Sequence, residues 1–171
     1  MDRTLLGKKA PATNLFTNVG LEGAAVASDG YLAVGTRFLG GSAPVAFRST
    51  DGLTWTAMPD VSTAVSPALA SGQTLAGAML SGVAELPGGT VVVAGAATLK
   101  DQAGFSLALL LLTSVGNGPW TLVRKAFAPV SAAQIKAGFP EPRAVAVSGG
   151  RIVVGGADVN GGVVWVGEPG S

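Results

Sequence analysis

The residues that most often carry out catalysis are scarce in this chain. Its 171 residues include no histidine and no cysteine, which removes the usual zinc ligands, Ser-His-Asp arrangements and thiolate nucleophiles. Carboxylates remain, and two of them facing each other across a sugar could hydrolyse a glycosidic bond. The carboxylates considered for such a pair are Asp29, Glu85, Asp101, Glu141, Asp158 and Glu168.

No spacing among these acidic residues selects a pair. Most of them lie in or beside turns, where Asp and Glu are usually solvated. The segment Asp158-Val159-Asn160-Gly161-Gly162 has oxygen ligands and glycines, as a calcium loop does, but it lacks the remaining ligands of such a motif. A plain Asn-Gly turn is therefore favoured there. The sequence predicts no catalytic residue, no metal site and no cofactor, and it leaves any binding residues unassigned.

The composition is typical of a folded protein rich in strands and turns. The chain has 26 glycines and 10 prolines, and 12% of its residues are charged beside 48% that are hydrophobic. A net charge of +1 provides no general field that would attract nucleic acid or an anionic membrane. No signal peptide is predicted in Met1–Pro11, and the apolar run Phe105–Val115 is too short to span a bilayer. We expect no nucleic-acid partner and no membrane insertion, and the compartment is left open.

Three segments repeat the order strand, tight turn, strand. They are Val26–Gly35 with an Asp-Gly turn, Val83–Gly95 with a Pro-Gly-Gly turn, and Val145–Gly155 with a Ser-Gly-Gly turn. The glycines that close the three segments are spaced 60 residues apart. Three hairpins of one type at one spacing predict a repeat protein.

The first two hairpins are each followed by an outer pair of strands. In the first pair, Val45–Met58, the turn is Ser49-Thr50-Asp51-Gly52-Leu53-Thr54-Trp55. An Asp side chain accepts hydrogen bonds from nearby backbone N–H groups, and Gly tolerates a positive φ. In the second pair, Phe105–Val123, the turn Ser114-Val115-Gly116-Asn117-Gly118-Pro119-Trp120 aligns with the first, with Gly116 in place of Asp51. In the third unit only one further strand is predicted, at Gly162–Val166.

The first turn resembles the Asp-box, or BNR repeat, of sialidase-like β-propellers, whose common pattern is Ser-x-Asp-x-Gly-x-Thr-Trp. The copy here is one residue shorter. The resemblance implies a structural turn between the third and fourth strands of a blade, away from the catalytic face, and it is consistent with an extracellular or cell-surface origin. The residues of this turn are Ser49, Asp51, Gly52, Thr54 and Trp55, and those of the degenerate second copy are Ser114, Asn117, Gly118 and Trp120.

We therefore predict an all-β, β-propeller-like fold of about three four-stranded antiparallel blade units. The last blade would be incomplete, or completed by an N-terminal strand near residues 14–19. The predicted organisation is an N-terminal tail at 1–20, blade 1 at 21–60, a linker at 61–80, blade 2 at 81–123, a linker at 124–141 and a partial blade 3 at 142–171.

The catalytic set of the sialidases is not recognisable in the sequence. Those enzymes bind a carboxylate with three arginines and use a Tyr nucleophile assisted by Glu, with an Asp as acid/base. None of the arginines here stands in the Arg-Ile-Pro setting of that family's first blade. The single tyrosine, Tyr31, begins the second strand of a hairpin, where an aromatic ring packed in a sheet is the favoured interpretation. Enzymatic activity is left open, with a non-catalytic role favoured.

The predicted function is that of a non-catalytic propeller repeat module or propeller segment that binds a glycan or a protein through its inter-blade loops. Two alternatives stay open. One is a fragment of a sialidase-like glycoside hydrolase whose catalytic residues lie largely outside these positions. The other is an interaction module that closes a ring from two chains, because three blades leave two sheet faces exposed.

Overall fold

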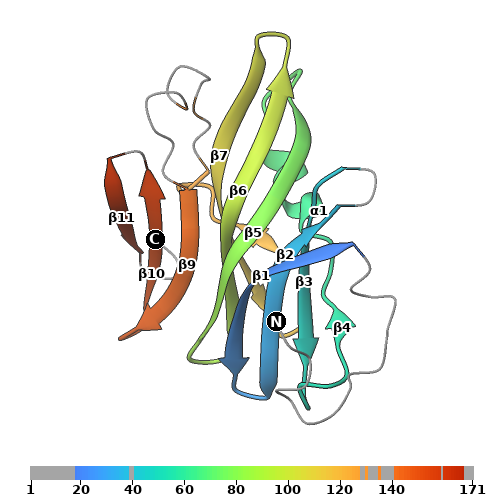
Figure 1. Cartoon of the computed structure of the whole chain (residues 1–171), viewed down its shortest axis with the longest axis vertical. Coiled ribbons are helices and arrows are strands. Elements are labelled where there is room, and N and C mark those ends of the chain that lie inside the picture. The colour runs from blue at the N-terminus through green and yellow to red at the C-terminus, as the bar shows by residue number, and fades with distance from the viewer. Residues whose placement is uncertain are drawn as a thin grey trace.

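The fold consists of three antiparallel sheets stacked side by side, with the second sheet between the other two (Figure 1). The computed structural model describes residues 18–38, 41–127, 130, 135, 141–158 and 160–167. Blade 1 is formed by β1 (Val19–Ala27), β2 (Gly30–Arg37), β3 (Ala43–Ser49) and β4 (Thr56–Ala57). Blade 2 is formed by β5 (Thr74–Leu86), β6 (Thr90–Asp101), β7 (Gly104–Val115) and β8 (Thr121–Leu122). Blade 3 is formed by β9 (Glu141–Ser148), β10 (Arg151–Asp158) and β11 (Gly161–Gly167).

This architecture confirms the predicted fold class. All three predicted hairpins and both predicted outer pairs are present, and within each sheet every strand pairs with its neighbour in sequence. The predicted N-terminal strand lies mostly outside the described residues, and Val19 already belongs to β1. Residues 168–171 are also outside the described part.

The predicted linker at 61–80 is wrong in its second half. It holds a short helix, α1 (Ser62–Val65), and a 3-10 turn, η3 (Ser66–Ala68), but β5 begins at Thr74. The stretch from Thr74 to Leu80 pairs with the far half of β6, which makes β5, with 13 residues, the longest described strand. Its small residues conceal the strand pattern, because alternation of size is weak where Ala and Gly occupy both faces. The predicted second linker, at 124–141, runs one residue too far, because Glu141 is already the first residue of β9.

Blade 2 buries both of its faces. Toward blade 1, Val91 and Val93 of β6 pack with Leu32 and Val34 of β2. Residues of α1 cover one side of this core. Toward blade 3, the intervening side chains of β6 pack with Ile152 and Val154. The four consecutive residues Val91–Ala94 are completely inaccessible to solvent. A continuous apolar run is therefore what this central strand requires.

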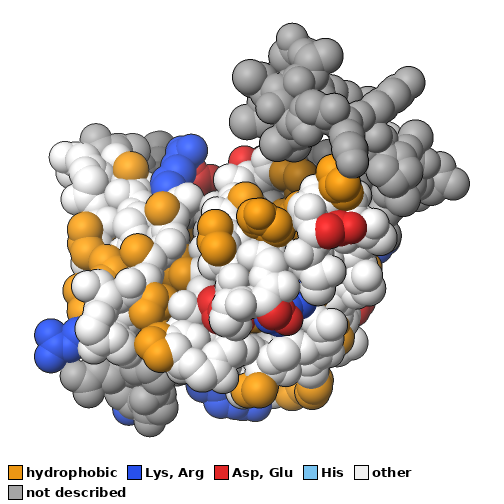
Figure 2. Space-filling model, turned by 90° about the horizontal axis from the view of Figure 1, so that it is seen from below, with side chains coloured by type: hydrophobic (Ala, Val, Ile, Leu, Met, Phe, Trp, Pro, Cys, Tyr) orange, Lys and Arg blue, Asp and Glu red, His pale blue; other side chains and the backbone are white. Residues whose placement is uncertain are grey.

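The two outer sheets each keep one face open. In blade 3 the side chains of Val164 and Val166 are 66% and 61% exposed. In blade 1 Val26 and Tyr31 are 77% and 44% exposed. Hydrophobic side chains are accordingly visible on the part of the molecule at the left of Figure 2, where Figure 1 places β9–β11.

Each blade carries the same β-bulge in its first strand. Counted from the hairpin turn, five residue pairs precede the bulge in all three sheets, and the extra residue is then Glu22, Ser81 or Arg143. A bulge pushes one strand toward its partner. The partner residue just beyond the bulge is glycine in every blade.

These repeated glycines are Gly35, Gly95 and Gly156, so the predicted equivalence of Gly155 is off by one position. A β-carbon on Gly35, Gly95 or Gly156 would overlap the carbonyl oxygen of Gly20, Met79 or Glu141, respectively. A β-carbon on Gly155 would meet no atom within 4 Å. Even spacing suggested Gly155, but the strand registers place the third glycine one residue further along the chain, at Gly156.

We predict that Gly95→Ala destabilises the protein by about 3 kcal/mol, because the added methyl group must displace backbone. Gly155→Ala is the matched control and should change stability by less than about 0.5 kcal/mol. Guanidinium unfolding of both variants followed by circular dichroism measures the difference. Equal losses in the two variants would show that the bulge does not impose the glycine.

Candidate functional site

The Asp-box-like turn is held by side chain to backbone hydrogen bonds. The Asp51 Oδ1 atom accepts from the N–H groups of Leu53 at 2.8 Å and Thr54 at 2.7 Å, and the Ser49 hydroxyl accepts from the Gly52 N–H at 2.8 Å. Gly52 has a φ of 71°, the conformation that favours glycine. The N–H groups of Thr54 and Leu53 lower the pKa of Asp51 to about 2. Trp55, which follows, is half-buried, and the ring of Tyr31 lies beside Gly52.

The corresponding turn of blade 2 is built differently. There the Ser114 hydroxyl donates to the Gly118 carbonyl oxygen at 2.7 Å, while Asn117 is exposed. Trp120 is 5% exposed and its indole N–H donates to the Pro59 carbonyl oxygen at 2.9 Å. The two tryptophans at matched sequence positions therefore differ, because Trp120 belongs to the core between blades 1 and 2 and Trp55 does not.

Two of the candidate carboxylates meet at one arginine between blades 1 and 2. The Arg48 guanidinium contacts Asp29 Oδ1 at 2.5 Å and Glu85 Oε1 at 3.3 Å, and it also donates to the Gly116 carbonyl oxygen at 3.2 Å. The second oxygen of Glu85 accepts from the Ser28 N–H at 2.5 Å.

This Arg48 cluster has a structural role. The side chains of Arg48 and Glu85 are only 10% and 7% exposed. Removing one partner from a buried ion pair costs about 3–5 kcal/mol. The cluster therefore fixes how the turns of blade 1 approach blade 2, and both carboxylates are engaged by a cation and not free to act as an acid and a base.

The other candidate carboxylates do not form a facing pair. Glu141 and Asp158 both line a hollow of about 460 Å³ at the opposite end of blades 2 and 3. Glu141 pairs across the sheet with Ala157, so alternation places it and Asp158 on opposite faces. The Glu141 carboxylate contacts Arg143 at 2.6 Å, and Asp158 accepts N–H bonds from Asn160 and Gly161 in its own hairpin turn. Asp101 likewise accepts from the N–H of Ala103 in a turn, and Glu168 lies outside the described residues.

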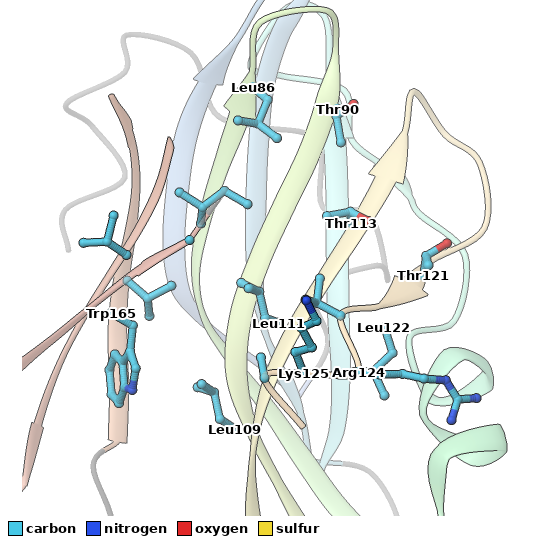
Figure 3. Close-up of a pocket in the computed structure, with 16 residues that line it drawn as sticks. Leu86, Thr90, Leu109, Leu111, Thr113, Thr121, Leu122, Arg124, Lys125 and Trp165 are labelled. Atoms are coloured by element: carbon cyan, nitrogen blue, oxygen red, sulfur yellow. The ribbon is translucent and has the colours of Figure 1, made fainter. Parts of the chain in front are cut away.

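A cleft of about 820 Å³, which we call the inter-blade cleft, lies between blades 2 and 3 (Figure 3). It is lined by residues of β5–β8 and the segment after β8 on one side, and by residues of β10 and β11 on the other. One wall is apolar, with Leu109 and Leu111 of β7, and Trp165 of β11 lies across from it.

Polar groups line the cleft on the side of β8. The hydroxyl-bearing residues are Thr90, Thr113 and Thr121, and Lys125 lies beside Leu111 (Figure 3). Arg124 also lines the cleft, but its guanidinium donates to the Pro67 carbonyl oxygen at 3.3 Å and points toward α1. None of the 16 lining residues is acidic. Its described residues can therefore bind through an aromatic face, hydroxyl groups and a cation, and none of them supplies a carboxylate as general acid or base.

Comparison with known proteins supports the fold. No family model and no curated protein matches the chain. A solved structure that matches is sucrose-6-phosphate hydrolase from Lactobacillus gasseri, with a TM-score of 0.52 and 16% sequence identity. The match covers 85% of this chain. The chain has the fold of a β-propeller segment. It spans 31% of the length of that enzyme, which is itself built on a propeller.

Several residues of these sites were not found from the sequence. Arg48 stands on a strand of otherwise small or apolar residues, and a lone charge at an inward position is the signal that could have revealed it. Trp165 was predicted only as part of the strand at Gly162–Val166, and the strand registers place it at the position that Phe47 holds in blade 1. Lys125 carried no signal, because it lies in a segment whose position depends on tertiary packing.

Among the described residues, no group of three or more acidic residues gathers as metal ligands would. No helix in the described ranges has the length and apolar character needed to cross a membrane.

We predict that acid weakens the Asp51 turn in a defined window. The pKa of Asp51 is lowered from 3.8 to about 2 in the folded protein, so its stabilisation is complete above pH 3.8 and is lost as the pH falls toward 2. Asp51→Asn should therefore lose less stability than the unmodified protein between pH 5 and about 2. Urea unfolding at these two pH values measures the difference. Identical pH dependence in the two proteins would mean that the carboxylate charge does not hold the turn.

Proposed function

We propose that this chain is a ligand-binding segment of a β-propeller, and that its ligand is a saccharide carrying an acidic group, bound in the inter-blade cleft. The observation that carries the proposal is the combination of Trp165, the threonine hydroxyls and Lys125 around one cavity. A volume of about 820 Å³ lies within the range of small-molecule sites, which are mostly apolar with a few polar groups.

Each part of the cleft suits one part of such a ligand. The apolar face of a pyranose ring packs against an indole, whose ring system is large and rigid. Hydroxyl side chains both donate and accept, so they pair with sugar hydroxyls in either sense. The Lys125 ammonium supplies a compact positive charge for a carboxylate or phosphate.

The cleft supports binding more than hydrolysis. Glycoside hydrolysis ordinarily requires two carboxyl groups flanking the scissile bond, and the residues lining the cleft include none. The acidic residues at the ends of the sheets are engaged by Arg48, by Arg143 or by turn N–H groups. The non-catalytic role expected from the sequence is therefore retained in the proposal.

A second candidate is a segment of a propeller glycoside hydrolase. It is favoured by the structural similarity to sucrose-6-phosphate hydrolase, of which the chain spans 31%. In that case the catalytic carboxylates would come from blades outside this sequence, and the inter-blade cleft would hold part of the substrate.

We predict that glucuronate and glucose 6-phosphate bind in the inter-blade cleft and shift the indole N–H resonance of Trp165 in a heteronuclear NMR titration. Lys125→Gln should weaken binding of both acidic sugars about tenfold while leaving the weak response to glucose unchanged, because only the charge contact is lost. Trp165→Leu should weaken the binding of all three sugars.

Lys100→Gln is the matched control, since Lys100 lies over the ring of Phe105 and does not line the cleft. The proposal fails if no acidic sugar perturbs Trp165, or if Lys100→Gln and Lys125→Gln have the same effect. Hydrolysis of sucrose 6-phosphate by a longer chain that includes further blades, with none by this chain alone, would favour the enzymatic candidate instead.

A further inference from the structure

The two ends of the blade stack expose faces that are buried everywhere else in the molecule. Positions counted from the hairpin turn can be compared between blades. By this count Leu21 of blade 1 is equivalent to Leu80 and Pro142, which are both buried. Tyr31 of blade 1 is likewise equivalent to Val91 and Ile152. Val91 and Ile152 are 0% and 4% exposed, whereas Leu21 and Tyr31 are 52% and 44% exposed. Among the described residues, no sheet covers this face of blade 1 as one does in blades 2 and 3.

Blade 3 lacks the neighbour on its other face. Its exposed Val164 is equivalent by register to Ala46 of blade 1 and Leu111 of blade 2. Ala46 is buried against blade 2, and Leu111 packs in the core toward blade 3. The open face of blade 3 is the kind of surface on which the following blade packs in the rest of the stack.

The first strands show how closely successive blades approach. A β-carbon on Gly23 would lie 2.9 Å from the carbonyl oxygen of Ser81, and one on Gly82 would lie 2.7 Å from the backbone nitrogen of Val145. The Ser81 hydroxyl donates to the Pro142 carbonyl oxygen at 2.6 Å. The bulge region of one blade therefore contacts the bulge region of the next blade.

The bulge residues at the two open ends carry opposite charges. Arg143 is the bulge residue of blade 3 and Glu22 that of blade 1, and both are exposed. If blade 1 of another molecule followed blade 3 in the same geometry as blade 3 follows blade 2, Arg143 would reach the segment around Glu22. Opposite charges at such a contact favour the correct pairing.

We propose that a second copy of this chain covers both open faces, with blade 3 of each copy packing on blade 1 of the other. The occupant is a second copy because each new contact repeats a blade-to-blade interface that the chain already forms twice. Two copies of three blades make six, within the four to eight of closed propellers. A head-to-tail contact that closes in this way gives two identical interfaces. The inter-blade cleft lies within one chain. The proposal of dimerisation and the proposal of sugar binding can therefore each fail without the other.

Sedimentation velocity over a concentration series tests the proposal. The unmodified chain should sediment at twice the monomer mass, and Val164→Glu combined with Val166→Glu should give a monomer with an unchanged circular dichroism spectrum. Val115→Glu is the matched control, because Val115 is 72% exposed but belongs to blade 2 and to neither open face. It should remain dimeric.

A charge exchange at the bulge residues tests the orientation of the two copies. Arg143→Glu or Glu22→Arg alone should weaken association about tenfold, and the double variant should restore it. A chain that stays monomeric at every concentration overturns the proposal. A dimer that persists after Val164→Glu and Val166→Glu also overturns it. The same holds if the double charge variant associates no more tightly than either single variant.

Discussion

Burial of both faces of blade 2 is the constraint on which the rest of the structure depends. A single antiparallel sheet can leave one face in water, but Val91–Ala94 in β6 are all inaccessible and therefore need a sheet on each side. Blade 1 and α1 cover one face, and blade 3 covers the other. Each outer blade is held mainly through its contact with blade 2, as expected where repeats contact only their neighbours.

Two local structural features set the geometry of this stack of blades. The bulge repeated in β1, β5 and β9 brings the first strands together and requires a glycine on the adjacent strand. The Arg48 cluster joins the turns of blades 1 and 2 on their common end. Between blades 2 and 3 no equivalent arginine stands in this position, because Thr113 and Val166 are the register equivalents of Arg48. The inter-blade cleft opens at that less tightly joined junction.

The sequence was sufficient for the order of strands because hairpin turns and apolar alternation are local signals. It was insufficient for β5, whose first half is made of Ala, Gly and Leu, and for the true partner of Gly35 and Gly95, which depends on where a bulge falls. The Ser, Asp and Gly residues of Ser49–Trp55 predicted a tight turn, and the bonds of Asp51 hold it. A lone charge on an apolar strand could have marked Arg48, but its partners and the cleft join residues far apart in the chain, which no local pattern indicates.

Native-state hydrogen exchange tests the central role of blade 2 most directly. The amides of Val92 in β6 and Leu110 in β7 should exchange only through global unfolding, with an exchange free energy equal to that of unfolding. In the monomeric variant with Val164→Glu and Val166→Glu, amides of β10 should exchange through a partial opening of lower free energy, because only one face of blade 3 is then covered. Exchange of the Val92 amide at a lower free energy than the β10 amides would contradict the account, since blade 2 would then open while an outer blade remained folded.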